Sequence, residues 1–155
     1  MFRIAGLALA GLSGFIDAAQ AGDLSEISGS WRTVRHGAEV KIIDCGDASP
    51  CGFLQSVDDD VSGGHTRDIN NKNPALRDRP LDGLPILWGY LREEEGWRKG
   101  RLYNPETGQT FRSSLELISP DRLRVQGCIG PLCRQQIWTR INRYETAIVK
   151  GDAHE

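Results

Sequence analysis

The sequence predicts an all-β fold: an eight-stranded up-and-down antiparallel barrel with one long loop between its third and fourth strands. Apolar and polar residues alternate in short segments, as on strands, and no stretch keeps a helical period. Compact turns separate most of these segments. The 155 residues include 18 glycines and 7 prolines, the residue types that favour such turns. Closing such a sheet into a barrel removes the exposed edges that an open sheet would leave.

The expected strands follow one another along the chain and differ mainly in how many of their faces are apolar. In the fourth strand, both alternating sets of residues are apolar or aromatic, which predicts a strand with no solvent-facing side. The eight segments are residues 30–34, 39–44, 52–57, 84–91, 97–103, 109–118, 122–128 and 134–141. Short turns at residues 93–96, 104–108 and 119–121 join neighbours, as in a meander.

The connection from Asp58 to Gly83 is long, polar and rich in Pro and Gly. Loops of this length without regular structure are uncommon and often functional. We expect one helical turn within it, because Asn73 can cap a turn that has Pro74 at its first position.

Residues 1–21 have the pattern of a secretory signal peptide. Arg3 precedes an apolar run over residues 4–16, and Ala19-Gln20-Ala21 supplies the small-x-small cleavage pattern. The run is shorter than the roughly 20 residues that cross a bilayer, so we expect no stable membrane insertion. We therefore expect cleavage after Ala21 and a periplasmic or secreted protein, with the barrel over residues 22–144 and a flexible polar tail over residues 145–155.

All four cysteines lie after the expected cleavage site, as two closely spaced pairs. An even number of cysteines in an exported protein indicates disulfides. Hairpin ends would bring Cys45 next to Cys51 and Cys128 next to Cys133, which favours local pairing. Pairing between the two hairpins is the main competitor. The gaps exceed those typical of zinc sites, so a metal-binding role has less support.

The charge and the motifs exclude several classes of protein. Nineteen basic residues against 21 acidic ones give a net charge of −2, so nucleic-acid binding through excess basic charge is excluded. We find no hydrolase elbow, zinc-protease helix or phosphate loop, and we expect no enzyme activity, cofactor or metal. The stretch that begins at Asp58 resembles the start of a calcium-binding EF-hand loop. Ile69 occupies the position where such a loop has a bidentate Glu, so an EF-hand is excluded.

Gly29-Ser30-Trp31 resembles the Gly-x-Trp motif that opens lipocalins and related calycin barrels. In those barrels a basic residue of the last strand packs over the Trp, and Arg140 is the matching residue here. A guanidinium over an indole contributes about 0.5–2 kcal/mol. The resemblance therefore implies an Arg140–Trp31 contact that closes one end of the barrel.

A more specific resemblance, to the bacterial domain-of-unknown-function family 2147, covers nearly the whole mature chain. Its most distinctive part is the run from Asn73 to Leu84, which contains Pro74, Leu76, Arg77, Arg79, Pro80 and Leu81. The other matching pieces are Gly29-x-Trp31, Val40-Lys41-Ile42, Cys45-Gly46, Cys51-Gly52, Trp97-x-x-Gly100-x-Leu102-Tyr103-Asn104-Pro105-x-x-Gly108 and Trp138-Thr139-Arg140. The resemblance implies an exported, lipocalin-like β-barrel without an established role. Gln55 and Ser56 stand where members are mostly apolar.

Three functional hypotheses follow from these observations, and the third, an uncharacterised enzyme, would require acid and base groups clustered in a cleft. In the first, the barrel holds a small, partly apolar ligand lined by aromatic residues, namely Phe53, Trp88, Tyr90, Trp97, Tyr103 and Phe111. In the second, these residues fill the barrel and the 58–83 loop is presented to a protein partner of the cell envelope. Arg77 and Arg79 are further candidates for ligand binding, because they can bind an anionic group; the alternative is that they tie the loop to the barrel.

Overall fold

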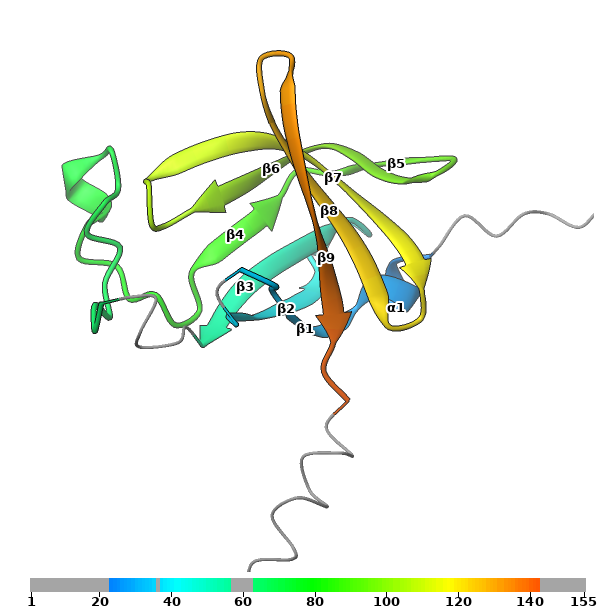
Figure 1. The fold of residues 1–155 in the computed structure, drawn as a ribbon, viewed down its shortest axis with the longest axis horizontal. Coiled ribbons are helices and arrows are strands. Elements are labelled where there is room, and N and C mark those ends of the chain that lie inside the picture. The colour runs from blue at the N-terminus through cyan, green and yellow to red at the C-terminus, as the bar shows by residue number, and fades with distance from the viewer. Residues whose placement is uncertain (1–22, 36, 57–62, 143–155) are drawn as a thin grey trace, which may run out of the picture.

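The computed structural model describes residues 23–35, 37–56 and 63–142, and within them the chain forms a closed antiparallel barrel (Figure 1). One short α-helix and one 3-10 turn accompany the strands. The elements are α1 (Leu24–Ile27), β1 (Gly29–Arg32), β2 (Glu39–Asp44), β3 (Pro50–Ser56), η1 (Pro74–Leu76), β4 (Pro85–Trp88), β5 (Leu91–Glu93), β6 (Gly96–Asn104), β7 (Gln109–Ser119), β8 (Arg122–Ile129) and β9 (Leu132–Arg140).

Eight strands close the barrel and a ninth extends it. The strand order is β4-β3-β2-β1-β9-β8-β7-β6-β5, and a further pairing of β4 with β6 joins the ends of the sheet. At this closure Leu87 of β4 lies opposite Leu102 of β6. The predicted eight-stranded barrel is confirmed, with β5 as an additional strand paired with β6.

The extra strand arises because the expected strand 84–91 is interrupted. Gly89 has a φ of 72°, a left-handed conformation that favours glycine, and the break separates β4 from β5. Opposite the break, β6 is irregular between Trp97 and Gly100. The aromatic ring of Tyr90 covers Gly100 so closely that a Cβ there would lie 2.3 Å from it. The interruption therefore lets the Tyr90 ring pack directly against Gly100 on β6, where any larger residue would clash with it.

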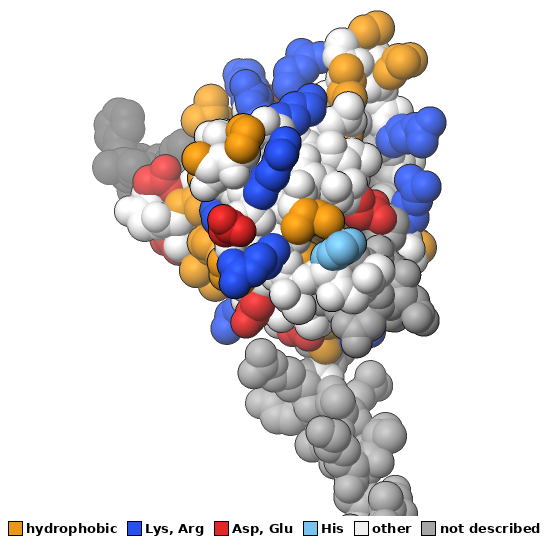
Figure 2. Space-filling view, turned by 90° about the vertical axis from the view of Figure 1, so that its left-hand side faces the viewer, with side chains coloured by type: hydrophobic (Ala, Val, Ile, Leu, Met, Phe, Trp, Pro, Cys, Tyr) orange, Lys and Arg blue, Asp and Glu red, His pale blue; other side chains and the backbone are white. Residues whose placement is uncertain are grey.

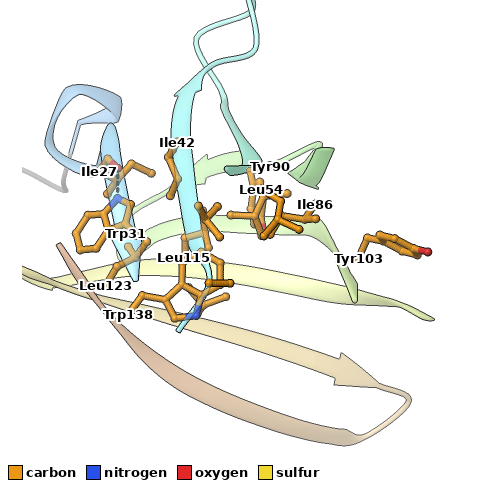
Figure 3. Close-up of a cluster of buried hydrophobic side chains, with 14 of the residues drawn as sticks. Ile27, Trp31, Ile42, Leu54, Ile86, Tyr90, Tyr103, Leu115, Leu123 and Trp138 are labelled. Atoms are coloured by element: carbon orange, nitrogen blue, oxygen red, sulfur yellow. Dashed lines mark hydrogen bonds between the residues drawn. The ribbon is translucent and has the colours of Figure 1, made fainter. Parts of the chain in front are cut away.

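The core lies inside the barrel and is densest at the end covered by α1, which we call the floor. Figure 3 shows Ile27, Trp31, Leu123 and Trp138 gathered at this end, and Trp31 and Leu123 are completely buried. The indole Nε1 of Trp31 donates to the Ile27 carbonyl at 2.8 Å, which ties α1 to β1. Burial of large apolar side chains at the floor supplies much of the stabilisation of the fold.

Arg140 covers Trp31 at the floor end of the barrel. Its guanidinium lies 4.2 Å from the centre of the Trp31 ring, as the resemblance to lipocalins implied. It also donates to the carbonyls of Ser28 at 2.8 Å, of Pro120 at 2.6 Å and of Glu26. One side chain of the last strand thus holds β1, the segment after α1 and the β7–β8 turn together.

Both disulfides have the predicted local pairing. Cys45 is bonded to Cys51 across the β2–β3 turn, with Cα atoms 5.1 Å apart. Cys128 is bonded to Cys133 across the β8–β9 turn, with Cα atoms 4.1 Å apart. Each bond therefore fixes the shape of one hairpin end and leaves the two hairpins unlinked to each other.

The proposed signal peptide, its cleavage site, residues 57–62 of the long loop and the polar tail from residue 145 lie outside the described residues. Across the part of the chain that is described, no helix is long and apolar enough to span a membrane. The expected helical turn in the long loop is present as η1, where Asn73 accepts from the Ala75 amide at 3.1 Å.

Candidate functional site

Inward-facing residues of the barrel are buried at one end and partly exposed at the other. Residues directly opposite each other on paired strands share a face, and near the floor the inward pair Leu123 and Trp138 is buried. At the other end, which we call the open end, inward-facing residues are only partly buried. These open-end wall residues are Leu102, Phe111, Gly127 and Gln136.

Gly127 lies at the centre of the open-end wall. A Cβ built on it would lie 3.4 Å from Leu102 Cδ2 and 3.4 Å from Phe111 Cβ, so both apolar side chains lie against this glycine. Gln136 lies opposite Val125, next along the same inner face. The wall therefore combines an apolar surface from β6 and β7 with the amide of Gln136 on β9. The exposed Arg134, opposite Gly127, adds one basic side chain at the edge of this face.

Tyr90, Trp97 and Phe111 are the three predicted aromatic residues that lie on the inner face. Tyr90 is 2% exposed, and its hydroxyl donates to Ser113 Oγ at 2.8 Å. Burial raises the pKa of Tyr90 well above its ordinary value, so the phenol is neutral. Tyr90 fills the barrel beneath the open-end wall, and Phe111 forms part of that wall.

Trp97 closes the inner face nearer the floor. It lies opposite Leu115 on β7, and the guanidinium of Arg92 lies 5.2 Å from the centre of its ring. Its Nε1–H is buried and has no hydrogen-bond partner among the described residues. A buried donor without an acceptor costs about 1–3 kcal/mol, so an acceptor that reaches this indole would stabilise the protein.

The structure does not place the other three predicted aromatic residues in the barrel interior. Phe53 lies opposite the exposed Lys41, and Trp88 lies opposite the exposed Arg101, so both are on the outer face. Tyr103 lies opposite the exposed Thr110 and points away from the core in Figure 3. Phe53 lies outside by simple alternation, because its neighbours Gly52 and Leu54 face inward. The interruption at Gly89 separates Trp88 from the inward Tyr90, and the irregularity within β6 places Tyr103 and Trp97 on opposite faces.

Tyr103 instead anchors the long loop to the outside of the barrel. Its hydroxyl donates to Asp68 Oδ1 at 2.6 Å, and Asp68 is completely buried. Asn71 Nδ2 donates to Asp68 Oδ2 at 2.7 Å and to the Tyr103 hydroxyl at 3.0 Å. Burial and the neighbouring Asp68 carboxylate raise the pKa of Tyr103 to about 12, so this phenol keeps its proton and donates.

Arg77 and Arg79 bind partners within the loop, whereas the structural alternative expected them to tie the loop to the barrel. Arg79 Nη2 pairs with Asp68 Oδ2 at 2.8 Å. Arg77 Nε donates to the Asn71 carbonyl at 2.8 Å. Both guanidinium groups therefore have protein partners within the segment.

The remaining residues of the distinctive loop motif have structural roles as well. The Arg79 amide donates to the Leu76 carbonyl at 3.2 Å, and Pro80 forms an isolated bridge with Arg67. Leu81 is buried, and its amide donates to the Thr66 carbonyl at 2.9 Å. The motif thus builds a folded loop that packs beside the β6–β7 turn (Figure 1).

A shallow, solvent-open pocket lies at the β5–β6 turn, away from the open end. It is lined by Glu93, Glu94, Glu95 and Arg98. Glu95 pairs with Arg98 at 3.3 Å, and Glu93 pairs with Lys99 at 3.0 Å. These charged side chains do not suit a partly apolar ligand. No cluster of three or more His, Cys, Asp or Glu side chains within the described segments is placed to hold a metal ion.

Sequence reasoning did not identify three members of the open-end wall. Leu102, Gly127 and Gln136 belong to expected strands, but their inward orientation depends on the register of β6 to β9. The alternation in β8, where Leu123 and Val125 face inward, extends by one step to Gly127 and is the signal that would have identified it.

Comparison with known proteins agrees with this architecture. A family model described as "Uncharacterized protein conserved in bacteria (DUF2147)" matches residues 29–140. Among solved structures, the chain is similar to one titled "Protein HP1028 from the human pathogen Helicobacter pylori belongs to the lipocalin family". That similarity has a TM-score of 0.68 and 20% identity, and it covers 83% of this chain and 92% of the other.

The structural similarity shows that the barrel has a lipocalin-like fold. The sequence matches no protein with a curated description. Because the family model extends from the Gly-x-Trp motif in β1 to Arg140 at the end of β9, this protein belongs to the DUF2147 family.

Proposed function

We propose that this protein binds a small, partly apolar molecule at the open end of its barrel. The observation that supports this function is the contrast along the inner face. Leu123 near the floor is completely buried, whereas Leu102, Phe111 and Gln136 face inward and remain partly exposed. Barrels of eight strands are just wide enough to hold one small ligand above a filled floor.

The chemistry of the open-end wall suggests what such a molecule contains. Leu102 and Phe111 offer an apolar surface, and Gln136 offers both a donor and an acceptor. Asn104 and Gln109 lie opposite each other at the rim and add further amide groups. A ligand with an apolar body and one hydrogen-bonding polar group matches this arrangement, and a cationic ligand does not, because Arg134 lies opposite Gly127 on the same face.

We also propose that the protein works outside the cytoplasm, in the periplasm or after secretion. The leader-like residues 1–21 support this location. The two disulfides support it independently, because such bonds persist in oxidising compartments.

The alternative, a filled barrel that presents the long loop to an envelope protein, has less support. Arg79 and Arg77 of the loop are engaged within it, by Asp68 and by the Asn71 carbonyl. The described part of the loop is folded onto the barrel through Tyr103.

Native mass spectrometry of protein purified gently from the periplasm tests the proposed function. We expect an added mass that disappears on denaturation. Gly127→Leu places a side chain over Leu102 and Phe111 and should abolish that mass, because it fills the open-end wall. Gln135→Leu is the matched control, since Gln135 is exposed and lies one residue from the wall. An added mass that persists in Gly127→Leu would contradict the proposed site.

A further inference from the structure

The β8–β9 hairpin ends in an apolar tip that stands clear of the barrel (Figure 1). Ile129 is 52% exposed and Leu132 is 77% exposed, on either side of the two-residue turn Gly130-Pro131. Gly130 has a φ of 55°, and proline holds a negative φ, a combination typical of a type II′ turn. The Cys128–Cys133 disulfide lies directly behind these residues. Two apolar side chains are thus held rigidly in solvent.

Three arginines surround this tip. Arg112 lies opposite Cys128, and its Nη2 donates to the Gly130 carbonyl at 2.6 Å. Arg101 lies directly opposite Arg112 on the neighbouring strand. Arg134 lies opposite Gly127, on the other face of the hairpin. Like charges directly opposite each other on paired strands repel, so an anion between Arg101 and Arg112 would stabilise the arrangement.

No described carboxylate neutralises these three arginines in an ion pair, although other basic residues of the barrel have such partners. The sequence has no Asp or Glu between Asp121 and Glu145, so the whole hairpin carries only basic charge. Figure 2 shows Lys and Arg side chains gathered over the upper part of the molecule beside hydrophobic side chains, with the acidic ones lower. A protein of net charge −2 therefore has a locally basic end.

We propose that this tip, with Ile129, Leu132 and Arg134 on one face of the hairpin and Arg101 and Arg112 on the other, binds the surface of an anionic phospholipid bilayer. Exposed apolar side chains enter the boundary between headgroups and acyl chains, and arginines contact the lipid phosphates around them. The shape fits a membrane surface better than a protein, because two side chains on a narrow tip bury too little area for a stable protein interface.

Co-sedimentation with vesicles tests the proposal, using phosphatidylcholine alone and phosphatidylcholine mixed with phosphatidylglycerol. We expect binding to the anionic vesicles that weakens as salt increases. Arg112→Gln and Arg134→Gln should each weaken binding about fivefold, as expected for one basic residue at a charged membrane surface. Leu132→Ser should weaken it about tenfold while leaving both disulfides and the net charge unchanged.

Matched control variants lie at the floor end of the same sheet. Ile118 is 39% exposed on β7, and Arg122 is exposed at the start of β8. Ile118→Ser and Arg122→Gln should bind anionic vesicles like the wild type. Equal binding to both kinds of vesicle, or equal loss in tip and floor variants, would overturn the proposal.

A fluorescence measurement separates bilayer binding from capture of a free anion. Leu132→Trp places an indole at the tip, and its emission should shift to shorter wavelength with anionic vesicles. Inorganic phosphate should cause no such shift. A shift that phosphate reproduces, or no shift on addition of anionic vesicles, would show that the tip does not enter a bilayer. Neither result depends on the ligand proposed for the open-end wall.

Discussion

The guanidinium of Arg140 lies over the indole of Trp31, 4.2 Å from the ring centre, and joins the last strand of the barrel to the first. The two residues are also directly opposite each other in the β1–β9 pairing. This contact lies where the two ends of the meander meet, so it stabilises closure of the barrel rather than one hairpin.

Replacement of Arg140 should therefore destabilise the whole fold. Arg140→Ala removes the contact with Trp31 and leaves the carbonyls of Ser28 and Pro120 without this donor. We expect a loss of about 2–4 kcal/mol in the free energy of unfolding. Arg140→Lys should recover only part of this loss, because an ammonium lacks the planar fork. Urea unfolding measures the stability of both variants, with Arg122→Ala as the control. Equal losses of stability in Arg122→Ala and Arg140→Ala would contradict the role of Arg140 in closing the barrel.

Tyr103→Phe should loosen the long loop before it unfolds the barrel. The change removes the donor to Asp68 Oδ1 and leaves a buried carboxylate oxygen with one partner fewer. We expect a loss of about 1–3 kcal/mol in stability. Limited proteolysis should show faster cleavage within residues 63–83, with strands β7 to β9 still protected. Unchanged cleavage in this segment would show that the hydroxyl does not hold the loop.

Alkaline pH should destabilise the protein through its buried tyrosines. Tyr103 has a pKa of about 12 when folded and about 10 when unfolded, so above pH 10 the unfolded chain loses a proton that the folded chain retains. This contribution is complete below pH 10 and is lost as the pH rises through 12. Tyr90 acts in the same direction. Unfolding curves between pH 9 and 12 should show a falling free energy, with a shallower slope in Tyr103→Phe.

The effects of substitutions at Gly52 and Leu87 on the free energy of unfolding should be strongly coupled. A Cβ on Gly52 would lie 2.6 Å from Leu87 Cδ1, so Gly52→Ala forces Leu87 out of its place in the completely buried core. We expect about 1–3 kcal/mol of destabilisation from Gly52→Ala and about 2–5 kcal/mol from Leu87→Ala. The double variant should be more stable than the sum of the two effects implies, since the new methyl group occupies part of the cavity. Simple additivity would argue against the contact.

The Cys128–Cys133 disulfide should stabilise the fold less than a disulfide that closes a long loop. Its two cysteines are separated by only 5 positions in the sequence. The entropy of closing so short a loop corresponds to about 2 kcal/mol. Replacing both cysteines with Ser should lower the unfolding free energy by about that amount, with the barrel intact by circular dichroism. A loss of the folded state would show that the bond does more than shape the tip.

Local patterns in the sequence determined most of the architecture. Alternation and turn chemistry predicted the strands, and the cysteine spacings predicted both disulfides, because these features depend on neighbouring residues. The likeness to lipocalins implied the contact of Arg140 with Trp31. In the described residues these expectations are confirmed, except that the expected strand 84–91 is divided at Gly89 into β4 and β5.

The assignment of aromatic residues to the interior depended on information that only the tertiary structure supplies. A strand has a period of two, so a single irregular residue transfers every later side chain to the opposite face. The break at Gly89 brings Tyr90 inside although Trp88 is outside, and the irregularity within β6 leaves Tyr103 outside although Trp97 is inside. Phe53 lies outside because its neighbours Gly52 and Leu54 face inward, which alternation alone did not reveal. The open-end wall and the Asp68–Tyr103 anchor join residues far apart in the chain, and only the closed register of the strands brings them together.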